Sequence, residues 1–529
     1  MEYHGAVYLL LFLPFTLMAY QLTPQKKRWI TLLLAGYVFF WSISGKLVLY
    51  LVGTSLFTHY IGIWLARTKE QYAKIKKELP KEQIAEVKKK YKNLEKKILA
   101  FGIVGLLCVL LSLKYSYFFL QNINTAAGLI GYGNILQPKK ILIPIGISFY
   151  TLQAISYMVD VYWERIQAEM HPGKVALFLS FFPQIMEGPI SLYSQTADAL
   201  WKGETIKTEN LSKGSVRILW GLFKKIIIAD RIYILVEELF GHYKDYSGVM
   251  ILVAAAAYTI QLYMEFSGCM DIILGSGRMF GIVLPENFQQ PFSAESASDF
   301  WRRWHITLGV WFKTYVFYPV SSSKPAKRWT KYGKKHLNKY VTTLGLSAIA
   351  LFPVWLCNGL WHGPRWSYIF YGMYYFVILL GETAMEPVRK AAIQKWHIPE
   401  KSRIYHFLRV AKTWGIIIIG ELFFRAESFM KGLYMFKNIF RNFEISRLWD
   451  GTLLTLGLDK ADYLVLAAGC MVVAIVGSMK ERNLLGDEGV QRFCLPVRWA
   501  IYYGLFFSVI IFGAYGTGYQ QVEMIYAGF

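Results

Sequence analysis

Ionisable and amide side chains gather in one part of an otherwise apolar chain, between residues 260 and 370. Polar groups inside apolar runs are costly to bury, so each of them is a functional candidate. They are Glu265, Asp271, Arg278, Asp299, Arg302, Arg303, His305 and His362, joined by Gln261, Ser267, Asn287 and Asn358. Outside this region the apolar runs hold few ionisable groups, and Glu421 and Arg425 are the exceptions.

Two histidines in this region are the candidates for proton-transfer chemistry. His305 lies in FWRRWHITLGVWF, and His362 lies in CNGLWHGPRWSYIFYG at the end of a long apolar run. An unperturbed imidazole has a pKa of about 6.5, and burial lowers it, so a buried histidine is neutral near pH 7. Neutral imidazole can take a proton from a hydroxyl group. A histidine beside a tryptophan at a helix end is also a common packing residue, so spacing alone leaves both roles open.

Asn358 precedes His362 by four residues, so the two share one face of a continuous helix. Asn358 could orient the imidazole or hold a carbonyl oxygen, and a helix–helix hydrogen bond is an equal alternative. No HExxH or GxSxG motif occurs, which argues against a zinc protease and a serine hydrolase. The five cysteines are scattered without a CxxC pair, so we expect neither a metal site nor a disulfide framework.

Long apolar segments must position these groups. Of 529 residues, 55% are hydrophobic and 18% are charged, below the roughly 25% charged residues of soluble domains. Several stretches approach or exceed the ~20 apolar residues that cross a bilayer as a helix. The pattern predicts an all-α polytopic transmembrane helical bundle of about 11–13 spans, with residues 300–320 as one span. Residues 175–190 contain Pro183, Gly188 and Pro189, which predicts a broken or re-entrant helix.

The net charge of +23 comes from 58 Lys and Arg against 35 Asp and Glu. The basic residues cluster in loops between apolar segments, as expected of cytoplasmic loops, and this placement argues against nucleic-acid binding. Residues 67–97 hold 12 basic and 5 acidic residues and are interrupted by Pro80. They predict an amphipathic helical hairpin on the cytoplasmic leaflet, with a solvated helical linker as the alternative.

Three motifs carry a resemblance to a known family. They are FSGCMDIILGSGRMFGIVLPENFQQPF (266–292), SDFWRRWHITLGVWF (298–312) and NGLWHGPRWSYIFYG (358–372). With IPIGISFYTLQAISYMVDVY (143–162), FFPQIMEGPI (181–190) and ELFFRAESF (421–429), they resemble the membrane-bound O-acyltransferase (MBOAT) superfamily. The similarity is to its bacterial branch, which modifies alginate, peptidoglycan and teichoic acid. It suggests one polytopic domain over 1–529, with a catalytic core at 141–429 and additional C-terminal spans at 430–529.

The resemblance implies an O-acyltransferase of the bacterial plasma membrane. It assigns the catalytic role to His362 and an accompanying role to His305, for which shaping the donor tunnel is the alternative. Asn358 and Trp361 would support the site, and Arg302, Arg303 and Lys313 would attract the phosphates of the donor, unless they only anchor the cytoplasmic face. The donor would be acetyl-CoA and the acceptor a hydroxyl of an extracytoplasmic polysaccharide or envelope polymer. Relatives often work with an extracytoplasmic SGNH-type transferase, so we expect such a partner and no metal.

The sequence departs from the family pattern at WFKTYVFYPVSSS (311–323). Relatives commonly carry Arg-Asp before the tyrosine and Gly-Gly after the proline, whereas this chain has Lys313, Thr314 and serines at 321–323. Donor handling and partner docking therefore stay open. One alternative is D-alanyl transfer from an aminoacylated carrier protein to teichoic acid. A transporter or flippase, or a non-catalytic scaffold, are alternatives of another class.

Overall fold

The computed structural model describes residues 1–133, 135–137, 141–484 and 489–515. Within these residues the regular elements are helices, and the only strand-like pairing is an isolated antiparallel bridge between Phe288 and Trp304. The prediction of an all-α polytopic fold is confirmed. Residues 516–529, the end of the predicted C-terminal segment, lie outside the described residues.

Seven candidate membrane spans are present in the described part of the chain. They are Gln25–Glu78, Lys81–Lys114, Gly248–Met279, Lys339–His362, Trp366–Lys395, Lys460–Glu481 and Leu495–Phe512. The first contains two helices that follow one another, and a shorter apolar helical stretch covers Val7–Leu22. The chain is therefore a multi-pass membrane protein. The number is below the 11–13 runs predicted from hydropathy, because several apolar runs are divided into short helices.

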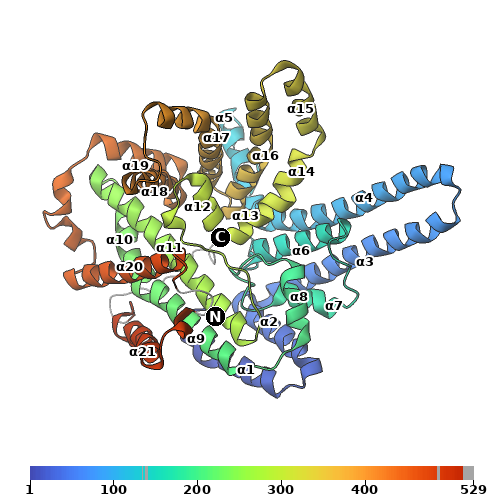
Figure 1. Ribbon diagram of the computed structural model, residues 1–529, viewed down its shortest axis with the longest axis horizontal. Helices are drawn as coiled ribbons and strands as arrows, with labels where there is room; N and C mark the ends of the chain where they lie inside the picture. Colours follow the sequence, from blue (N-terminus) through green and yellow to red (C-terminus); the bar gives the residue numbers. More distant parts are fainter. Residues whose placement is uncertain (134, 138–140, 485–488, 516–529) are drawn as a thin grey trace. The chain divides into compact units, whose positions relative to one another are not determined.

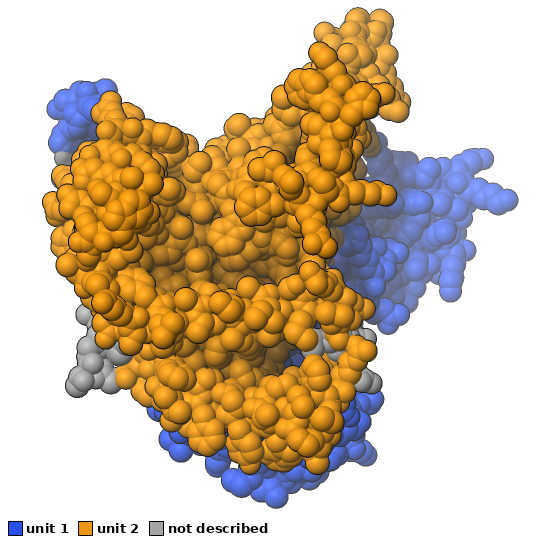
Figure 2. Space-filling model, turned by 60° about the vertical axis from the view of Figure 1, so that its left-hand side comes forward, with its two compact units in different colours: residues 1–215, 273–285 blue, residues 216–272, 286–529 orange. Residues whose placement is uncertain are grey.

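The chain divides into two compact units, and each is described by itself. Unit 1 comprises residues 1–215 and 273–285, and unit 2 comprises residues 216–272 and 286–529. Unit 2 is orange in Figure 2, which shows a hollow in the face of this unit turned to the viewer. Two of the three boundaries between the units fall within helices, α9 (Thr208–Leu222) and α11 (Gly248–Met279), and the third follows Pro285.

Unit 1 holds the N-terminal helices. They are α1 (Leu13–Leu22), α2 (Arg28–Ser44), α3 (Val48–Glu78), α4 (Lys81–Lys114), α5 (Ser116–Leu129), α6 (Ile147–Tyr162), α7 (Pro172–Ser180) and α8 (Tyr193–Lys202). Helices α3 and α4 run side by side and project as a hairpin (Figure 1). The basic segment 67–97 is helical on both sides of Pro80, as predicted, and it continues the two long helices. Residues 181–192 follow α7 without forming a helix, so the run at 175–190 is broken as predicted.

Unit 2 holds the remaining helices and the candidate site. They are α10 (Asp230–Gly241), α12 (Ala297–Arg303), α13 (Ile306–Phe312), α14 (Tyr318–Ser321), α15 (Lys324–His336), α16 (Lys339–His362), α17 (Trp366–Lys395), α18 (Arg403–Arg425), α19 (Phe429–Arg441), α20 (Lys460–Glu481) and α21 (Leu495–Phe512). Two π-helices, Phe223–Ala229 and Lys313–Phe317, interrupt the α-helical pattern. The expected single span at 300–320 is wrong, because the chain turns sharply between α12 and α13.

Small residues allow the helices that carry the site to pack closely. In the α16–α17 hairpin, a Cβ added to Gly359 would overlap the carbonyl oxygen of Tyr368, and one added to Gly372 would overlap that of Trp355. Gly221 and Gly268 face each other in the same way, 2.5 to 2.8 Å from an added Cβ to the opposite carbonyl oxygen. Close approach of backbones through glycine is typical of helix packing in membranes.

Buried ion pairs join α11 to α9 and to the π-helix Phe223–Ala229 that follows α9. Lys225, fully buried, pairs with Asp230 at 2.7 Å and with Glu265 at 3.2 Å. Asp271 accepts from Arg217 and Lys224, both at 2.5 Å. Charges in apolar surroundings persist only when they are paired in this way. Glu265 and Asp271, two of the polar residues that the sequence singled out, therefore belong to a structural network.

Candidate active site

His305 occupies the turn between α12 and α13 in a left-handed conformation, with φ +46°. Such a backbone is uncommon for a residue with a side chain and persists only where its surroundings enforce it. Here the segment around Asn287 runs antiparallel to the turn. The amide of Gln289 donates to the carbonyl of Arg303 at 2.9 Å, and the amide of Ile306 donates to the carbonyl of Asn287 at 3.0 Å.

The side chain of Asn287 holds this turn from inside the protein. Its Oδ1 accepts from the backbone amide of Thr307 at 3.1 Å and from the Thr307 hydroxyl at 2.9 Å. The same oxygen lies 3.2 Å from Nδ1 of His305. Because a backbone amide can only donate, the Asn287 atom is the oxygen, and Nδ1 of His305 must carry the hydrogen. In the neutral ring, Nε2 is then the nitrogen that can accept a proton.

The imidazole of His305 is neutral over the physiological pH range. Its side chain is 3% exposed and lies outside the candidate spans. Burial lowers the pKa of His305 to about 3, because the charged form loses its hydration. The ring packs against Phe266 and Trp361, with centroid distances of 4.9 and 5.4 Å.

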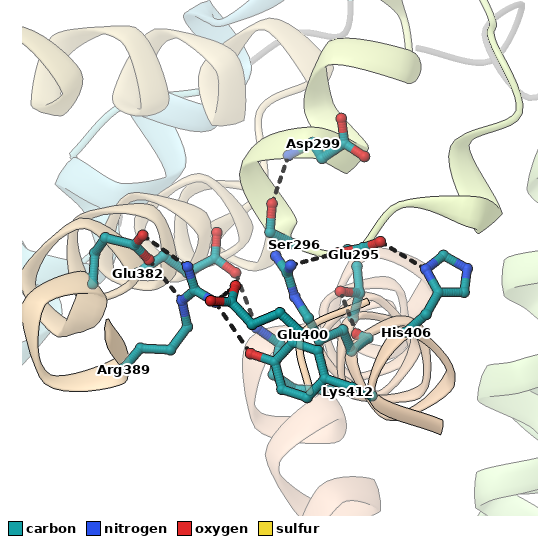
Figure 3. A network of polar contacts seen from close by, with 12 residues as sticks. Glu295, Ser296, Asp299, Glu382, Arg389, Glu400, His406 and Lys412 are labelled. Atoms are coloured by element: carbon teal, nitrogen blue, oxygen red, sulfur yellow. Dashed lines mark hydrogen bonds and ion pairs between the residues drawn. The ribbon is translucent and has the colours of Figure 1, made fainter. Parts of the chain in front are cut away.

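The start of α12 is fixed by side chains from its own N-cap and from α17. The Ser296 hydroxyl accepts from the amide of Asp299 at 3.1 Å, and the Glu382 carboxylate accepts from the amides of Ala297 and Ser298 at 3.0 and 3.1 Å. Figure 3 shows Glu382 within a wider polar network that also holds Lys412, which pairs with Glu382 at 3.3 Å. These contacts satisfy backbone donors that a helix start leaves open. They fix the helix that carries Arg302 and Arg303.

A cleft with a volume of about 340 Å³ adjoins His305 within unit 2. Its walls are mainly apolar and come from α12, α13, α16, α17 and the π-helix after α13. Its polar lining residues include Arg302, His305, Lys313 and Asn358. Within the described residues, the buried Oδ1 of Asn358 has no hydrogen-bond partner. A mainly apolar cleft with a few convergent polar groups is typical of a small-molecule site.

His362 lies at the end of α16, directly after Trp361. The Trp361 ring contacts both imidazoles, with centroid distances of 5.4 Å to His305 and 4.9 Å to His362. The His362 side chain is 5% exposed and packs edge-on against Phe424 and Tyr371, at 4.9 and 5.7 Å. His362 is not among the residues that line the 340 Å³ cleft. The two histidines thus share Trp361 as a neighbour, and only His305 lines the cleft.

A buried carboxyl group lies behind the aromatic residues around His362. The Tyr371 hydroxyl donates to Oε1 of Glu421 at 2.9 Å, and the Glu421 side chain is 1% exposed. The sequence marked Glu421 as an unusual charge in an apolar run, without a role. The hydrogen bond of Tyr371 depends on a residue 50 positions away.

The structure brings five of the six predicted site residues into or beside this site and turns one away. His305, Asn358 and Arg302 line the cleft, and Trp361 and His362 lie next to it. Arg303 points elsewhere and pairs with Asp299 at 3.0 Å and with Glu481 at 2.8 Å. Asn287 and Thr307 complete the site. Asn287 was noted only as one polar residue among several, and Thr307 gave no signal at all.

No group of three or more His, Cys, Asp or Glu side chains placed to hold a metal ion occurs in the described parts of the chain. The chemistry that the site itself offers is proton transfer by neutral imidazole, together with hydrogen bonding by Asn358. Two cationic side chains, Arg302 and Lys313, lie on the cleft wall and could bind phosphate.

Comparisons with known proteins agree on one family. The model of the membrane-bound O-acyltransferase (MBOAT) family matches residues 164–426, within the predicted core at 141–429. The probable alginate O-acetylase AlgI of Pseudomonas syringae pv. tomato is 31% identical over 432 residues, 81% of this chain and 73% of that protein.

Two further relatives carry different names. The peptidoglycan O-acetyltransferase of Helicobacter pylori is 27% identical over 452 residues, 80% of this chain and 76% of that protein. The teichoic acid D-alanyltransferase of Bacillus subtilis is 27% identical over 297 residues, 55% of this chain and 71% of that protein. With the helical membrane fold, these similarities lead to one conclusion: the chain is an O-acyltransferase that belongs to the MBOAT family.

Proposed function

We propose that this O-acyltransferase moves an acetyl group from acetyl-CoA, on the cytoplasmic side, to a hydroxyl of an extracytoplasmic polysaccharide or cell-envelope polymer of a bacterium. The observation that carries the proposal is the extent of the similarity. Proteins named as O-acetylases or O-acetyltransferases align with about four-fifths of this chain. The D-alanyltransferase of Bacillus subtilis aligns with 55% of it.

In this proposal the donor occupies the 340 Å³ cleft. The apolar walls suit a pantetheine arm, and Arg302 and Lys313 would bind the phosphates of coenzyme A. Asn358 would donate a hydrogen bond from its Nδ2 to the thioester carbonyl oxygen, since its carboxamide lies on the cleft wall. A hydrogen bond to the developing oxyanion lowers the barrier of acyl transfer.

The acceptor would approach beside His362, which lies outside the lining of the 340 Å³ cleft. His362 would take the proton from the acceptor hydroxyl as the hydroxyl oxygen attacks the thioester carbon. The new C–O bond forms, the C–S bond breaks, and the proton passes from His362 to the leaving thiolate, which departs as the free thiol of coenzyme A. His305, held in one tautomer by Asn287, would bind the donor with Nε2 and fix it beside Trp361.

The acceptor hydroxyl belongs to the polymer itself or to an SGNH-type partner that passes the acetyl group on. In both cases the enzyme performs the same transfer, and only the second acceptor requires a partner protein. Retention of activity with a purified polymer alone would favour the first acceptor. The role proposed for His362 is therefore the same with either acceptor.

The test is release of coenzyme A thiol from acetyl-CoA by the full-length protein in proteoliposomes, with an acceptor polysaccharide present. We expect turnover by the wild type and a loss of at least 100-fold in His362→Ala. His336→Ala is the matched control, because His336 is exposed at the end of α15 and lies outside the site. An aminoacylated carrier protein serves as the second donor.

Three outcomes would contradict the proposal. Discharge of the carrier without use of acetyl-CoA would make the protein a D-alanyl transferase. Full activity of His362→Ala would remove the assigned base. A cooperative thermal unfolding transition would show that the protein is folded. If such protein, supplied with polymer and partner, uses neither donor, a transporter or a scaffold would be favoured.

A further inference from the structure

Unit 2 contains a second, larger cleft that the acyl-transfer site does not use. Its volume is about 540 Å³, within the roughly 300–1,000 Å³ typical of small-molecule sites. It lies between α11, α18 and α20, and residues 290–293 close one side. The floor is aromatic, because Phe292 stacks on Trp414 at 4.4 Å and contacts Tyr263 at 5.0 Å.

Small side chains on α20 keep this cleft open. Ala474, Gly477 and Ser478 face it along one side of the helix, together with Cys470. A Cβ added to Gly477 would meet only the Cγ of Gln290, at an ordinary distance of 3.6 Å. Protein interiors are otherwise packed without holes of this size. Helices α11 and α20 are both candidate membrane spans, so hydrocarbon is the solvent around this cleft.

Charged side chains mark one end of the cleft, where α20 ends. Glu481 is neutralised by Arg303 at 2.8 Å. Its neighbours Lys480 and Arg482 form no ion pair within 4 Å among the described residues, and the Asp271 carboxylate attracts Lys480 from a greater distance. Arg482 lines the apolar cleft, and Lys480 lines an adjoining polar basin of about 260 Å³. The two hollows share Gln290 and Glu481 as wall residues.

An apolar cleft that opens at a cationic end fits an anionic amphiphile. Basic residues at the end of a span attract the phosphates of anionic lipids at the membrane surface. Lys480 and Arg482 continue the basic bias of the cytoplasmic loops, which places this end at the cytoplasmic leaflet. We propose that the cleft is a binding site for one anionic glycerophospholipid of that leaflet, with an acyl chain beside Gly477 and the phosphate at Lys480 and Arg482.

Native mass spectrometry of the full-length protein tests the site. Phosphatidylglycerol and phosphatidylcholine of identical chains compete for the detergent-solubilised protein. We expect one phosphatidylglycerol per chain, bound at least five-fold in preference to phosphatidylcholine. Gly477→Leu fills the cleft and should remove this lipid. Gly504→Leu on α21 is the matched control, because nothing lies within 4 Å of a Cβ added there.

Labelling of Cys470 offers a second readout, which reports binding of the lipid acyl chain separately from binding of the headgroup. Its thiol lines the cleft, whereas Cys108 and Cys494 are exposed elsewhere. Phosphatidylglycerol should slow maleimide labelling of Cys470 at least five-fold and leave the labelling of Cys108 and Cys494 unchanged. The double variant Lys480→Gln, Arg482→Gln should lose the preference for phosphatidylglycerol.

Each contrary result would overturn the proposal. Equal binding of both lipids would show that no headgroup site exists. Unchanged binding in Gly477→Leu would show that the lipid binds outside this cleft. Protection of Cys470 by a co-purifying polypeptide would make the occupant a partner helix. None of these results depends on the acetyl donor or on His362, so the lipid site and the proposed function are tested separately.

Discussion

Asn287 Oδ1 lies 3.2 Å from Nδ1 of His305, and the direction of this hydrogen bond is fixed by Thr307. The backbone amide of Thr307 donates to the same oxygen, so the Asn287 side chain can only accept there. His305 must therefore donate from Nδ1, and its Nε2 carries no proton in the neutral ring. One carboxamide thus sets the tautomer of an imidazole 18 positions away and also holds its left-handed backbone.

Removal of this acceptor should impair catalysis more than stability. Asn287→Ala leaves the Nδ1 hydrogen of His305 and both Thr307 donors without their oxygen, which costs about 1–3 kcal/mol of unfolding free energy. Because the ring can then change tautomer and rotate, we expect kcat for thiol release to fall 10- to 100-fold. Thermal unfolding and steady-state kinetics on the same preparation measure the two effects. A loss of kcat no larger than that of an equally destabilised variant would contradict this role.

The variant Asn287→Asp distinguishes two roles of Asn287: control of the protonation of His305 and structural support of the turn. A carboxylate keeps all three hydrogen bonds, but its charge favours the imidazolium form and raises the pKa of His305. We expect rescue of the fold relative to Asn287→Ala and an acid limb of the pH–rate profile that is displaced to higher pH than in the wild type. An unchanged profile would mean that Asn287 supports the turn without governing the imidazole.

The low pKa of His305 predicts acid sensitivity of the fold. The folded protein leaves this imidazole neutral down to a pH of about 3, whereas an unfolded chain protonates it below its ordinary value of 6.5. Falling pH therefore favours unfolding, by about 2 kcal/mol between pH 6.5 and 5. Between pH 6.5 and 5, His305→Gln should lose less stability than the wild type. Thermal unfolding at the two pH values measures this difference. His336→Gln, an exposed control, should follow the wild type.

Glu382 should affect donor binding, because it anchors the helix that carries Arg302. Glu382→Ala leaves the amides of Ala297 and Ser298 without acceptors, a loss of about 1 kcal/mol at a helix start. We expect KM for acetyl-CoA to rise three- to ten-fold with a smaller change in kcat. Glu400→Ala is the control within the same network (Figure 3), since Glu400 pairs with Arg389 at 3.6 Å and touches no α12 amide in the described contacts. Equal effects of both variants would contradict the anchoring role.

Local sequence patterns could predict the helical class and the identity of the two histidines. Apolar runs predicted the membrane helices, and Pro183 and Gly188 predicted a break after α7. The motif around His362 indicated a site at a helix end, where α16 indeed stops. These features depend on residues that are close together along the chain, so they can be read directly from the sequence. The catalytic roles of His305 and His362 stay predictions.

Non-local contacts account for what the sequence could not predict. Hydropathy averages over 300–320 and hides the turn at His305, because Asn287 enforces that turn from outside the run. The orientation of Arg303 depends on Glu481, which lies 178 positions away. The contact of Trp361 with the His305 ring depends on how α16 meets the α12–α13 turn. None of these contacts follows from spacing or composition.

The α16–α17 hairpin offers the sharpest test of how packing positions His362. Gly372→Ala would place a methyl group on the carbonyl oxygen of Trp355 and about 3.1 Å from the amide of Gly359. Such overpacking costs about 1–3 kcal/mol, and it would push apart the two helices that hold His362. We expect a lower melting temperature and at least a ten-fold loss of thiol release. Gly381→Ala on the same helix meets nothing within 4 Å, so it should be neutral or stabilising, because alanine favours helix by about 1 kcal/mol over glycine. Equal stability of the two variants would show that the hairpin does not depend on close contact at Gly372.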